Sequence, residues 1–247
     1  MSLNLASFIR TGKKIGTACL DTFFPLFCIG CNTYGHILCS DCQKTFPRRL
    51  KQRCPLCFKS TTSRGDTCFS CANREEIDGI FAGSLYKEPL VSLCIHTFKY
   101  RFIYDLSHPL GTWLAERVRE TDIPLPDLYI PVPLHSRRLR FRGFNQSSLL
   151  AEALKDELTP HIGDVLLEHC LIRTRYTKPQ MQTTTKDERY NNLRNAFEIR
   201  KGTTPLVLGK SIWLIDDVST TGTTLLECAR VLKKAGAKNV FGIVLAR

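Results

Sequence analysis

One stretch near the end of the 247-residue chain constrains its fold and chemistry more than any other. Its apolar residues 212–215 lead into Asp216 and Asp217, and then into a small hydroxylated loop, residues 219–224, which contains one glycine. A short apolar run of this kind predicts a parallel strand that is buried on both faces. A helical pattern follows the loop, so the stretch predicts a strand–loop–helix unit of an α/β fold.

The loop has the composition of a phosphate-binding site, because backbone N–H groups and hydroxyls at a helix N-terminus form a cradle for phosphate. Its residues are Ser219, Thr220, Thr221, Gly222, Thr223 and Thr224. Asp216 and Asp217 stand at the carboxyl end of the strand, where open α/β sheets bind ligands, and there they could hold two hydroxyls of a sugar. Phosphate and diol together indicate a ribose 5-phosphate. The alternative interpretation is a solvated strand end followed by an ordinary helix cap.

Eight of the twelve cysteines form four C-x-x-C pairs. They are Cys28 with Cys31, Cys39 with Cys42, Cys54 with Cys57, and Cys68 with Cys71. Two such pairs complete the closed four-cysteine shell of a structural zinc site, so the pattern predicts two zinc ions with folding and interaction roles. A disulfide framework is the weaker alternative, since no signal-peptide pattern is visible.

Two pairings of these cysteines are open. The short gaps within each half favour sequential sites, in which the first pair joins the second and the third joins the fourth. In an interleaved arrangement the first pair would join the third. The isolated cysteines are expected to be buried, unreactive thiols. They are Cys19, Cys94, Cys170 and Cys228.

Composition indicates a globular protein with basic character. No apolar stretch approaches the roughly 20 residues of a membrane span. The net charge of +12 favours polyanionic partners such as nucleic acid, phosphorylated metabolites or acidic membrane, although a basic soluble enzyme would have the same charge. Residues 3–20 are interpreted as a helix that packs on the rest, because basic residues interrupt the apolar run that a secretory signal needs.

A second informative stretch, residues 131–146, follows a predicted strand at 128–132. Four arginines fall within six residues, and Gly143 then permits a turn before a helix predicted at 148–158. The guanidinium fork suits bidentate phosphate binding, so the stretch predicts an anion-binding loop. A solvated basic loop and a nucleic-acid contact are the alternatives.

The remaining chain predicts further elements. A strand is expected at 80–86 and helices at 90–99 and 110–118. Residues 170–200 are polar and poor in apolar periodicity, and we interpret them as a lid that excludes water from the site. From 211 the pattern becomes regular, with a strand at 211–218, a helix at 223–235 and a strand at 239–246. Such a βαβ unit predicts parallel strands.

Together these motifs resemble the ComF family, which includes the bacterial competence proteins ComF and ComFC and the related GntX. Besides the paired C-x-x-C motifs, the matching strings are Pro-Val-Pro-Leu-His from 131, Arg-Gly-Phe-Asn-Gln from 142, Thr-Lys-Pro-Gln from 177, Arg-Tyr-Asn-Asn from 189 and Asp-Asp-Val-Ser-Thr-Thr-Gly-Thr-Thr from 216. The resemblance covers nearly the whole chain. It implies a type I phosphoribosyltransferase-like parallel sheet with helices on both faces and a small N-terminal double zinc-ribbon module. We therefore expect an N-terminal helix within 1–27, the zinc module at 28–73 and the phosphoribosyltransferase-like domain at 77–247.

The resemblance also implies residue roles. Asp216 and Asp217, the catalytic candidates, would bind the ribose 2- and 3-hydroxyls of phosphoribosyl pyrophosphate (PRPP), and the threonine loop would bind its 5-phosphate. The pyrophosphate loop would contain Arg137, Arg138, Arg142, Asn145 and Gln146. The lid would contain Thr177, Gln180, Arg189 and Asn192. If the protein is catalytic, Mg²⁺ would bridge the pyrophosphate and the ribose hydroxyls.

Three functions are compatible with these expectations. The resemblance implies a cytoplasmic competence protein that handles imported single-stranded DNA in natural transformation and keeps a site for PRPP or a related phosphosugar. The first alternative is an active Mg²⁺-dependent phosphoribosyltransferase, although nothing in the sequence marks a base-specific acceptor pocket. The second is an adaptor whose zinc ribbons dock a competence helicase or a recombination partner.

Overall fold

The computed structural model of the protein describes residues 26–48, 50–72, 77–100, 104–176, 193 and 195–247. The predicted helix at 3–20 and the expected lid residues lie outside these ranges. Those lid residues are Thr177, Gln180, Arg189 and Asn192. The chain divides into two compact units, Met1–Thr45 and Phe46–Arg247. The smaller unit contains the first two cysteine pairs and the helix α2 (Ser40–Lys44).

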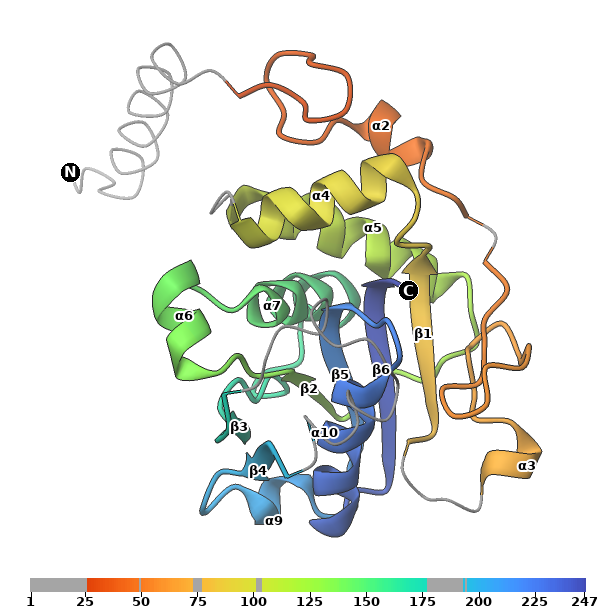
Figure 1. Cartoon of the computed structure of the whole chain (residues 1–247), viewed down its shortest axis with the longest axis vertical. Coiled ribbons are helices and arrows are strands. Elements are labelled where there is room, and N and C mark those ends of the chain that lie inside the picture. Colours follow the sequence, from red (N-terminus) through yellow and green to blue (C-terminus); the bar gives the residue numbers. More distant parts are fainter. Residues whose placement is uncertain (1–25, 49, 73–76, 101–103, 177–192, 194) are drawn as a thin grey trace, which may run out of the picture. The chain divides into compact units, whose positions relative to one another are not determined.

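In the larger unit the described residues form a four-stranded sheet in the order β1-β6-β5-β2 (Figure 1). The strands are β1 (Gly79–Ser84), β2 (Leu128–Pro131), β5 (Ser211–Val218) and β6 (Asn239–Ala246). All three pairings are parallel, as the βαβ pattern predicts. The bounds of β5 and β6 are those expected from the sequence, because continuous apolar runs that end at polar loops mark them clearly.

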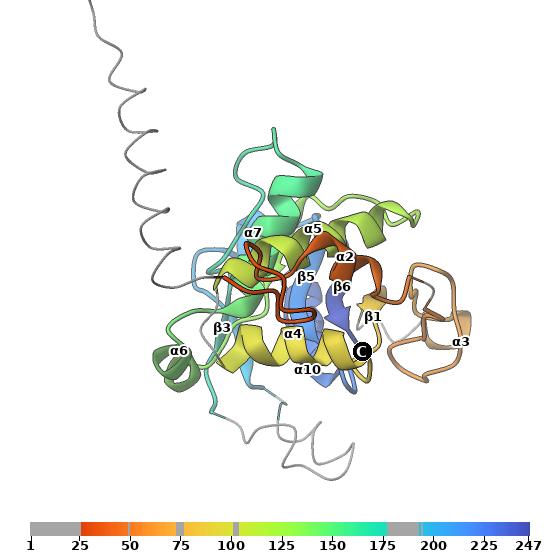
Figure 2. The same ribbon diagram turned by 90° about the horizontal axis from the view of Figure 1, so that it is seen from above.

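Helices cover both faces of this sheet. Figure 2 shows α5 (Ser107–Arg119) and α7 (Gln146–Leu158) on one side of β5 and β6, and α10 (Thr223–Lys234) on the other. The helix α4 (Pro89–Tyr100) lies above the carboxyl edge of the strands in Figure 1. The short η1 (Tyr104–Leu106) leads into α5. The predicted parallel α/β architecture is therefore confirmed.

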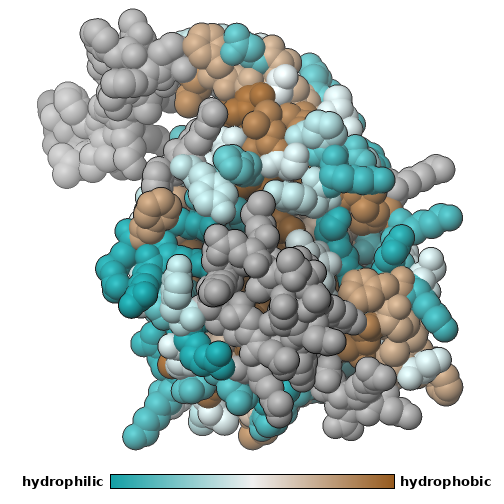
Figure 3. Space-filling view, viewed as in Figure 1, coloured by the Kyte–Doolittle hydropathy of each residue, from teal (hydrophilic) through white to brown (hydrophobic). Residues whose placement is uncertain are grey.

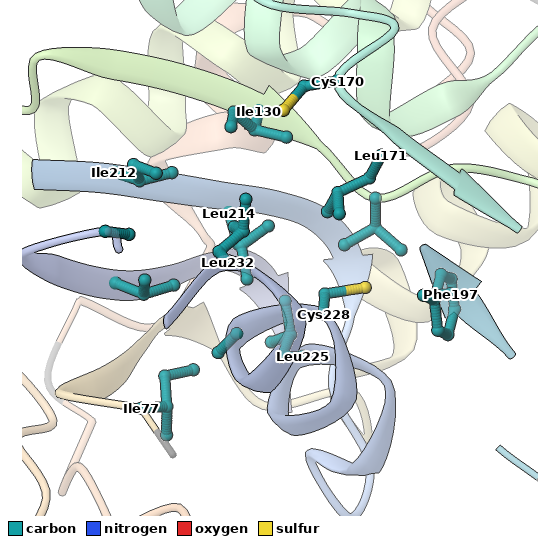
Figure 4. Packing of buried hydrophobic residues seen from close by; sticks show 14 of the residues in the cluster. Ile77, Ile130, Cys170, Leu171, Phe197, Ile212, Leu214, Leu225, Cys228 and Leu232 are labelled. Carbon is teal, nitrogen blue, oxygen red and sulfur yellow. The ribbon is translucent and has the colours of Figure 1, made fainter. Parts of the chain in front are cut away.

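The buried core anchors the helix that follows the threonine loop. Leu225, Cys228 and Leu232 recur on one face of α10, as expected for an amphipathic helix, and all are at most 1% exposed. They pack toward Leu214 of β5 (Figure 4). Cys94 and Cys170 are also buried, which confirms the expectation for the isolated cysteines of the described residues. This packing fixes the start of α10, and with it the end of the preceding loop.

Residues 170–200 differ from the expectation of one polar segment. Their ends form a two-stranded antiparallel pair, β3 (Leu171–Arg173) with β4 (Phe197–Ile199). The buried side chains of Leu171 and Phe197 hold this pair of strands against the core. Each strand has only three residues, which is too short for an alternation of polar and apolar residues to predict a strand. The short helices α3 (Phe69–Ala72) and α9 (Thr204–Val207) also lacked a periodic signal.

The arginine-rich stretch was expected to be a loop, and this expectation was wrong, because it forms the helix α6 (Ser136–Arg142). The His135 imidazole accepts a hydrogen bond from the Arg137 backbone N–H at 3.2 Å and caps the first turn. Gly143 ends the helix in the left-handed conformation, with φ of 74°. Arginine also has a high helix propensity, which favours a helix here.

The second cysteine segment, residues 54–71, belongs to the larger unit, Phe46–Arg247, which is called the sheet domain below. Within the described sheet β1 is an edge strand, and the Gln52 side chain pairs with its residue Ala82. The amide of Gln52 donates to the Ala82 carbonyl at 2.9 Å, and its oxygen accepts from the Ala82 N–H at 3.2 Å. Nearby, the Ile80 N–H donates to the Gly65 carbonyl at 2.9 Å. These bonds replace the strand that would otherwise lie beside β1.

No helix in the described part of the chain has the length and apolarity that a membrane crossing requires.

Candidate functional site

A pocket of about 390 Å³ lies at the carboxyl edge of the sheet, where the sequence places the ligand. Its lining brings together side chains from different elements. Asp216 and Asp217 come from β5, Lys99 from the last turn of α4, and Arg138 and Arg142 from α6. The strand–loop–helix and the arginine stretch, which are distant in sequence, therefore meet at one site.

The threonine loop closes one side of this site. Thr220 and Thr224 line the pocket, and Gly222 adopts the left-handed conformation, with φ of 79°, immediately before α10. Only glycine takes this conformation at little cost, so Gly222 allows the chain to turn into the helix. The Ser219 N–H donates to the Ala246 carbonyl of β6 at 3.0 Å, which ties the loop to the sheet.

Hydroxyl groups gather inside this loop. The Thr221 and Thr223 hydroxyl oxygens lie 2.7 Å apart. The Ser219 hydroxyl is buried and has no hydrogen-bond partner among the described residues. A buried hydroxyl without a partner is unfavourable, so its presence here suggests that a ligand oxygen completes the set. The cavity beside the loop is small, about 10 Å³.

The two carboxylates are not a solvated strand end. The Asp217 carboxylate is 8% exposed and forms an ion pair with the Lys99 ammonium at 2.8 Å. One oxygen of Asp216, Oδ1, accepts hydrogen bonds from the Ser147 hydroxyl and from the Asp217 N–H, both at 2.9 Å. Each carboxylate is thus held in one orientation by a neighbour from a different element or from the strand itself.

This packing shifts the pKa values of the acidic pair and its partner. Burial, together with the charge of Asp217, raises the pKa of Asp216 to about 7, although Lys99 and Ser147 oppose the shift. Burial disfavours the charged form of Lys99, but the adjacent Asp217 carboxylate outweighs it and raises the Lys99 pKa above its usual range. At neutral pH the site therefore contains a firmly charged lysine and a partly protonated aspartate.

Opposite the acidic pair the pocket is cationic. The Arg142 guanidinium donates to the Gln146 side-chain oxygen at 3.0 Å and lies 5.0 Å from the centre of the Tyr100 ring. Burial and the nearby Arg142 lower the pKa of Arg138, and burial and Arg138 lower that of Arg173 to about 10. Arg138 and Arg173 remain charged at neutral pH. Such crowding of cations is relieved when an anion binds between them.

The structure places the expected pyrophosphate-loop residues differently. Arg138, Arg142 and Gln146 line the pocket. Asn145 instead caps α7, where its side-chain oxygen accepts from the Ser147 N–H at 3.2 Å. Arg137 does not line the described part of the pocket. Its guanidinium instead lies 5.3 Å from the centre of the Tyr176 ring.

Sequence reasoning missed Lys99, Tyr100 and Arg173 as members of the site. The predicted helix at 90–99 gave no sign that its last turn would reach the carboxyl edge of the sheet. Arg173 belonged to the segment interpreted as a lid. The one signal available was that a lysine and an aromatic residue follow directly after the buried face of that helix.

Cysteine side chains gather in two four-membered clusters, and within each cluster the sulfurs lie within 4.8 Å of one another. The clusters are Cys28, Cys31, Cys39 and Cys42, and Cys54, Cys57, Cys68 and Cys71. The favoured sequential pairing is therefore confirmed. Three of the sulfur–sulfur distances are 3.5–3.6 Å. Around a tetrahedral Zn²⁺, sulfurs would lie about 3.8 Å apart, so both clusters are consistent with zinc sites.

Each cluster favours one thiolate, the form that binds metal. Burial opposes ionisation of Cys28 and Cys54, but backbone N–H groups that donate to their sulfurs lower the pKa of each to about 6. The Cys39 N–H, for example, donates to the Cys28 sulfur at 3.3 Å, and the Cys68 N–H donates to the Cys54 sulfur at 3.4 Å. Backbone N–H groups thus stabilise one thiolate in each cluster in the same way.

The second cluster is connected to the threonine loop through the end of β6. The Arg247 side chain donates to the Arg53 carbonyl at 3.0 Å, next to Cys54, and its guanidinium lies 5.0 Å from the centre of the Phe58 ring. The preceding residue, Ala246, accepts the hydrogen bond from Ser219. A metal at the second cluster would therefore be coupled to the same strand end that holds the loop.

Comparison with known proteins agrees with this architecture. Residues 145–247 match the family model described as the phosphoribosyl transferase domain. This segment contains α7, the acidic pair and the threonine loop. The sheet and the site thus define a protein with a type I phosphoribosyltransferase-like domain, to which a cysteine-rich segment is joined.

Relatives extend the similarity across the chain. Competence protein F of Haemophilus influenzae is 33% identical over 240 residues, which cover 91% of this chain and 98% of that protein. DNA utilization protein YhgH of Salmonella typhi is 33% identical over 208 residues, covering 82% and 87%. Competence protein ComFC of Streptococcus pneumoniae is 29% identical over 217 residues, covering 85% and 87%. The chain belongs to the family of competence protein F.

The two cysteine clusters can be distinguished by a matched pair of variants. Cys31 and Cys57 are the exposed members of their clusters. We expect Cys57→Ser to lower the free energy of unfolding of the sheet domain by roughly 2–4 kcal/mol, because it removes a metal that stabilises this domain by binding only to the folded form. Both tryptophans, Trp113 and Trp213, lie in this domain, so their fluorescence during urea unfolding reports the loss.

Cys31→Ser is the control, and we expect it to leave the tryptophan transition unchanged. Zinc analysis should give two ions per chain in the parent protein and one in each variant. An equal loss of stability in both variants would contradict the assignment of the second cluster to the sheet domain.

Asp216 should make stability depend on pH. Its pKa is about 7 in the folded protein and near 3.8 when unfolded, so its contribution is fully present below pH 3.8 and disappears as pH rises through 7. Between about pH 5.5 and about pH 8.5 the parent protein should therefore lose about 2 kcal/mol that Asp216→Asn retains. Urea unfolding at both pH values measures the difference, with the exposed Asp122→Asn as control. Parallel pH profiles for the parent protein and Asp216→Asn would refute the expectation.

Proposed function

We propose that this protein is a ComF-type competence protein, which handles single-stranded DNA taken up by the cell and binds a ribose 5-phosphate group such as that of PRPP. The names of its relatives, competence protein F and DNA utilization protein, support the biological role. One observation supports the site chemistry above all others. A single pocket brings the acidic pair, the threonine loop and the arginines of α6 together.

Each part of a phosphoribosyl group has a matching part of the pocket. The 5-phosphate would bind at the mouth of the threonine loop, where backbone N–H groups and hydroxyls converge at the start of α10. Asp216 and Asp217 would accept hydrogen bonds from the ribose hydroxyls. Arg138 and Arg142 would bind a second phosphate group or a pyrophosphate at the opposite wall. We place this role in the cytoplasm.

An active phosphoribosyltransferase is the alternative that uses the same geometry. Transfer would break the bond between ribose C1 and the pyrophosphate oxygen and form a bond between C1 and a nucleophilic atom of the acceptor, with pyrophosphate as the leaving group. The arginines of α6 would stabilise the charge that develops on the leaving pyrophosphate, which is the largest contribution a preorganised site makes. Mg²⁺ bound with PRPP would supply further charge neutralisation. The acceptor in such a reaction is not marked by any residue of the pocket.

Binding of single-stranded DNA is supported by a separate feature, the exposed surface of α6. Phe141 is 72% exposed and lines the pocket, and arginines surround it on the same short helix. Figure 3 shows hydrophilic side chains gathered where α6 lies, at the left of the view. Aromatic rings that stack on bases, set among arginines that contact phosphates, are the usual means of gripping single strands. A single strand of DNA could thus run from the pocket across α6.

Titration calorimetry with PRPP tests the phosphoribosyl site. Arg138 lines the pocket, whereas Arg140 is an exposed arginine of the same helix outside the lining. We expect Arg138→Ala to weaken PRPP binding by at least about tenfold, which is the loss of one charge-assisted contact. Arg140→Ala, the matched control, should stay within about twofold of the parent protein. Equal affinities for both variants, or no binding to the parent protein, would refute the proposed site.

Fluorescence anisotropy with a labelled single-stranded oligonucleotide tests the DNA surface. Phe141→Ala should weaken binding by about tenfold, because stacking on one base contributes about 1–3 kcal/mol. The slope of affinity against salt should stay the same, since no charge is removed. Arg140→Ala should instead lower that slope by about one. An unchanged affinity in Phe141→Ala would exclude stacking on this ring.

A further inference from the structure

The pocket contains a cation that belongs to the protein itself. The Lys99 ammonium lies 2.8 Å from an Asp217 oxygen, and the two side chains are only 21% and 8% exposed. The pair joins the last turn of α4 to the carboxyl end of β5. It is therefore an interaction inside the pocket between distant parts of the chain, unlike a pair between neighbours on the surface of one helix.

Aromatic packing fixes the end of the helix that carries this lysine. Phe98 is fully buried, and its ring centre lies 5.8 Å from that of Phe144, which follows the last turn of α6. Tyr100 lies under the Arg142 guanidinium at 5.0 Å. The residues on either side of Lys99 thus pack against α6 and the residues that follow it, which places the backbone of Lys99 next to the acidic pair.

Charge counting shows what this cation does for an anionic ligand. Four cationic side chains line the pocket among the described residues, against two carboxylates. The cations are Lys99, Arg138, Arg142 and Arg173. An acidic pair repels a phosphosugar, and enzymes that bring the two together commonly place a divalent cation between them. Here the lysine already neutralises Asp217, and the three arginines leave the pocket positive.

The lysine also competes with a metal for the same carboxylate. Mg²⁺ requires oxygen ligands at about 2.0–2.1 Å in a nearly octahedral arrangement. An ammonium within hydrogen-bond distance of Asp217 both occupies an oxygen of that ligand and repels a second cation. Asp216 is engaged as well, since its Oδ1 accepts hydrogen bonds from the Ser147 hydroxyl and the Asp217 N–H. One oxygen of each carboxylate is therefore already engaged, and the ammonium stands beside Asp217 where a metal would have to approach.

We propose that Lys99 is the resident cation of this site, so that the protein binds its phosphosugar ligand without Mg²⁺. The proposal rests on the proposed phosphoribosyl site and makes it more specific. Lys99 acts here as a positioning residue that neutralises Asp217 and keeps the carboxylate available to the ribose hydroxyls. Its signature is the dependence of binding on magnesium, which a merely structural lysine would not change.

Titration calorimetry of the zinc-loaded protein with PRPP tests this directly. It is done with magnesium and in metal-depleted buffer without a chelator, so that the cysteine sites remain loaded. We expect affinities within about threefold of each other, a difference that corresponds to less than 1 kcal/mol. Binding that requires magnesium would overturn the role of Lys99 and leave the phosphoribosyl site intact. No binding under either condition would overturn both, so the two failures are distinguishable.

Substitution of the lysine makes the test sharper. Lys99→Met should weaken PRPP binding without magnesium by at least about tenfold, and magnesium should restore most of the loss, because Asp217 then needs another cation. Lys99→Arg should keep the parental behaviour. Lys155→Met, which removes a lysine paired with Asp156 outside the pocket lining, is the control.

Folding of these variants is checked by thermal melting, because Lys99→Met leaves the buried Asp217 unpaired. The double variant Lys99→Met with Asp217→Asn removes both charges and avoids that cost. We expect its PRPP binding to be independent of magnesium, since no carboxylate remains to be neutralised at that position. Magnesium dependence in the double variant, or its absence in a folded Lys99→Met protein, would contradict the proposal.

Discussion

The parallel pairing of β5 with β6 determines where the site forms. The two strands are in register from Ser211 with Asn239 to Val218 with Ala246, so they end together. The same ladder continues one step further, because the Ser219 N–H donates to the Ala246 carbonyl. The acidic pair thus lies near the end of a rigid strand, and the threonine loop begins from a fixed point. A ligand at this edge meets groups whose positions the sheet has already set.

The other groups of the site reach that edge from neighbouring elements. The helix α7 presents Ser147 to Asp216, and α4 presents Lys99 to Asp217. Arginines from α6 and β3 complete the opposite wall. Two carboxylates would be costly to bury alone, and four cations crowded together would repel each other. Each set offsets the other, and the cationic excess that is left favours an anionic ligand.

Sequence patterns were informative where chemistry and periodicity coincide. Continuous apolar runs gave the bounds of β5 and β6, and the spacing of the cysteines gave the sequential clusters. The helix α6 was missed because its stability depends on the His135 cap and on Gly143, which are single residues without a periodic signal. Lys99 and Arg173 were missed because tertiary packing alone brings them to the pocket. The roles predicted for individual site residues stay predictions, and the lid residues lie outside the described chain.

The pairing of Gln52 with β1 has a consequence for self-association. One side chain makes the two hydrogen bonds to Ala82 that a neighbouring strand would make, and Gln52 stands just before the first cysteine of the second cluster, Cys54. Without a metal to shape that turn, the amide would be released and the unpaired backbone of β1 would face solvent. An open strand edge of this kind recruits strands from other molecules. Loss of metal at the second cluster would then favour edge-to-edge pairing between molecules, quite apart from any effect on ligand binding.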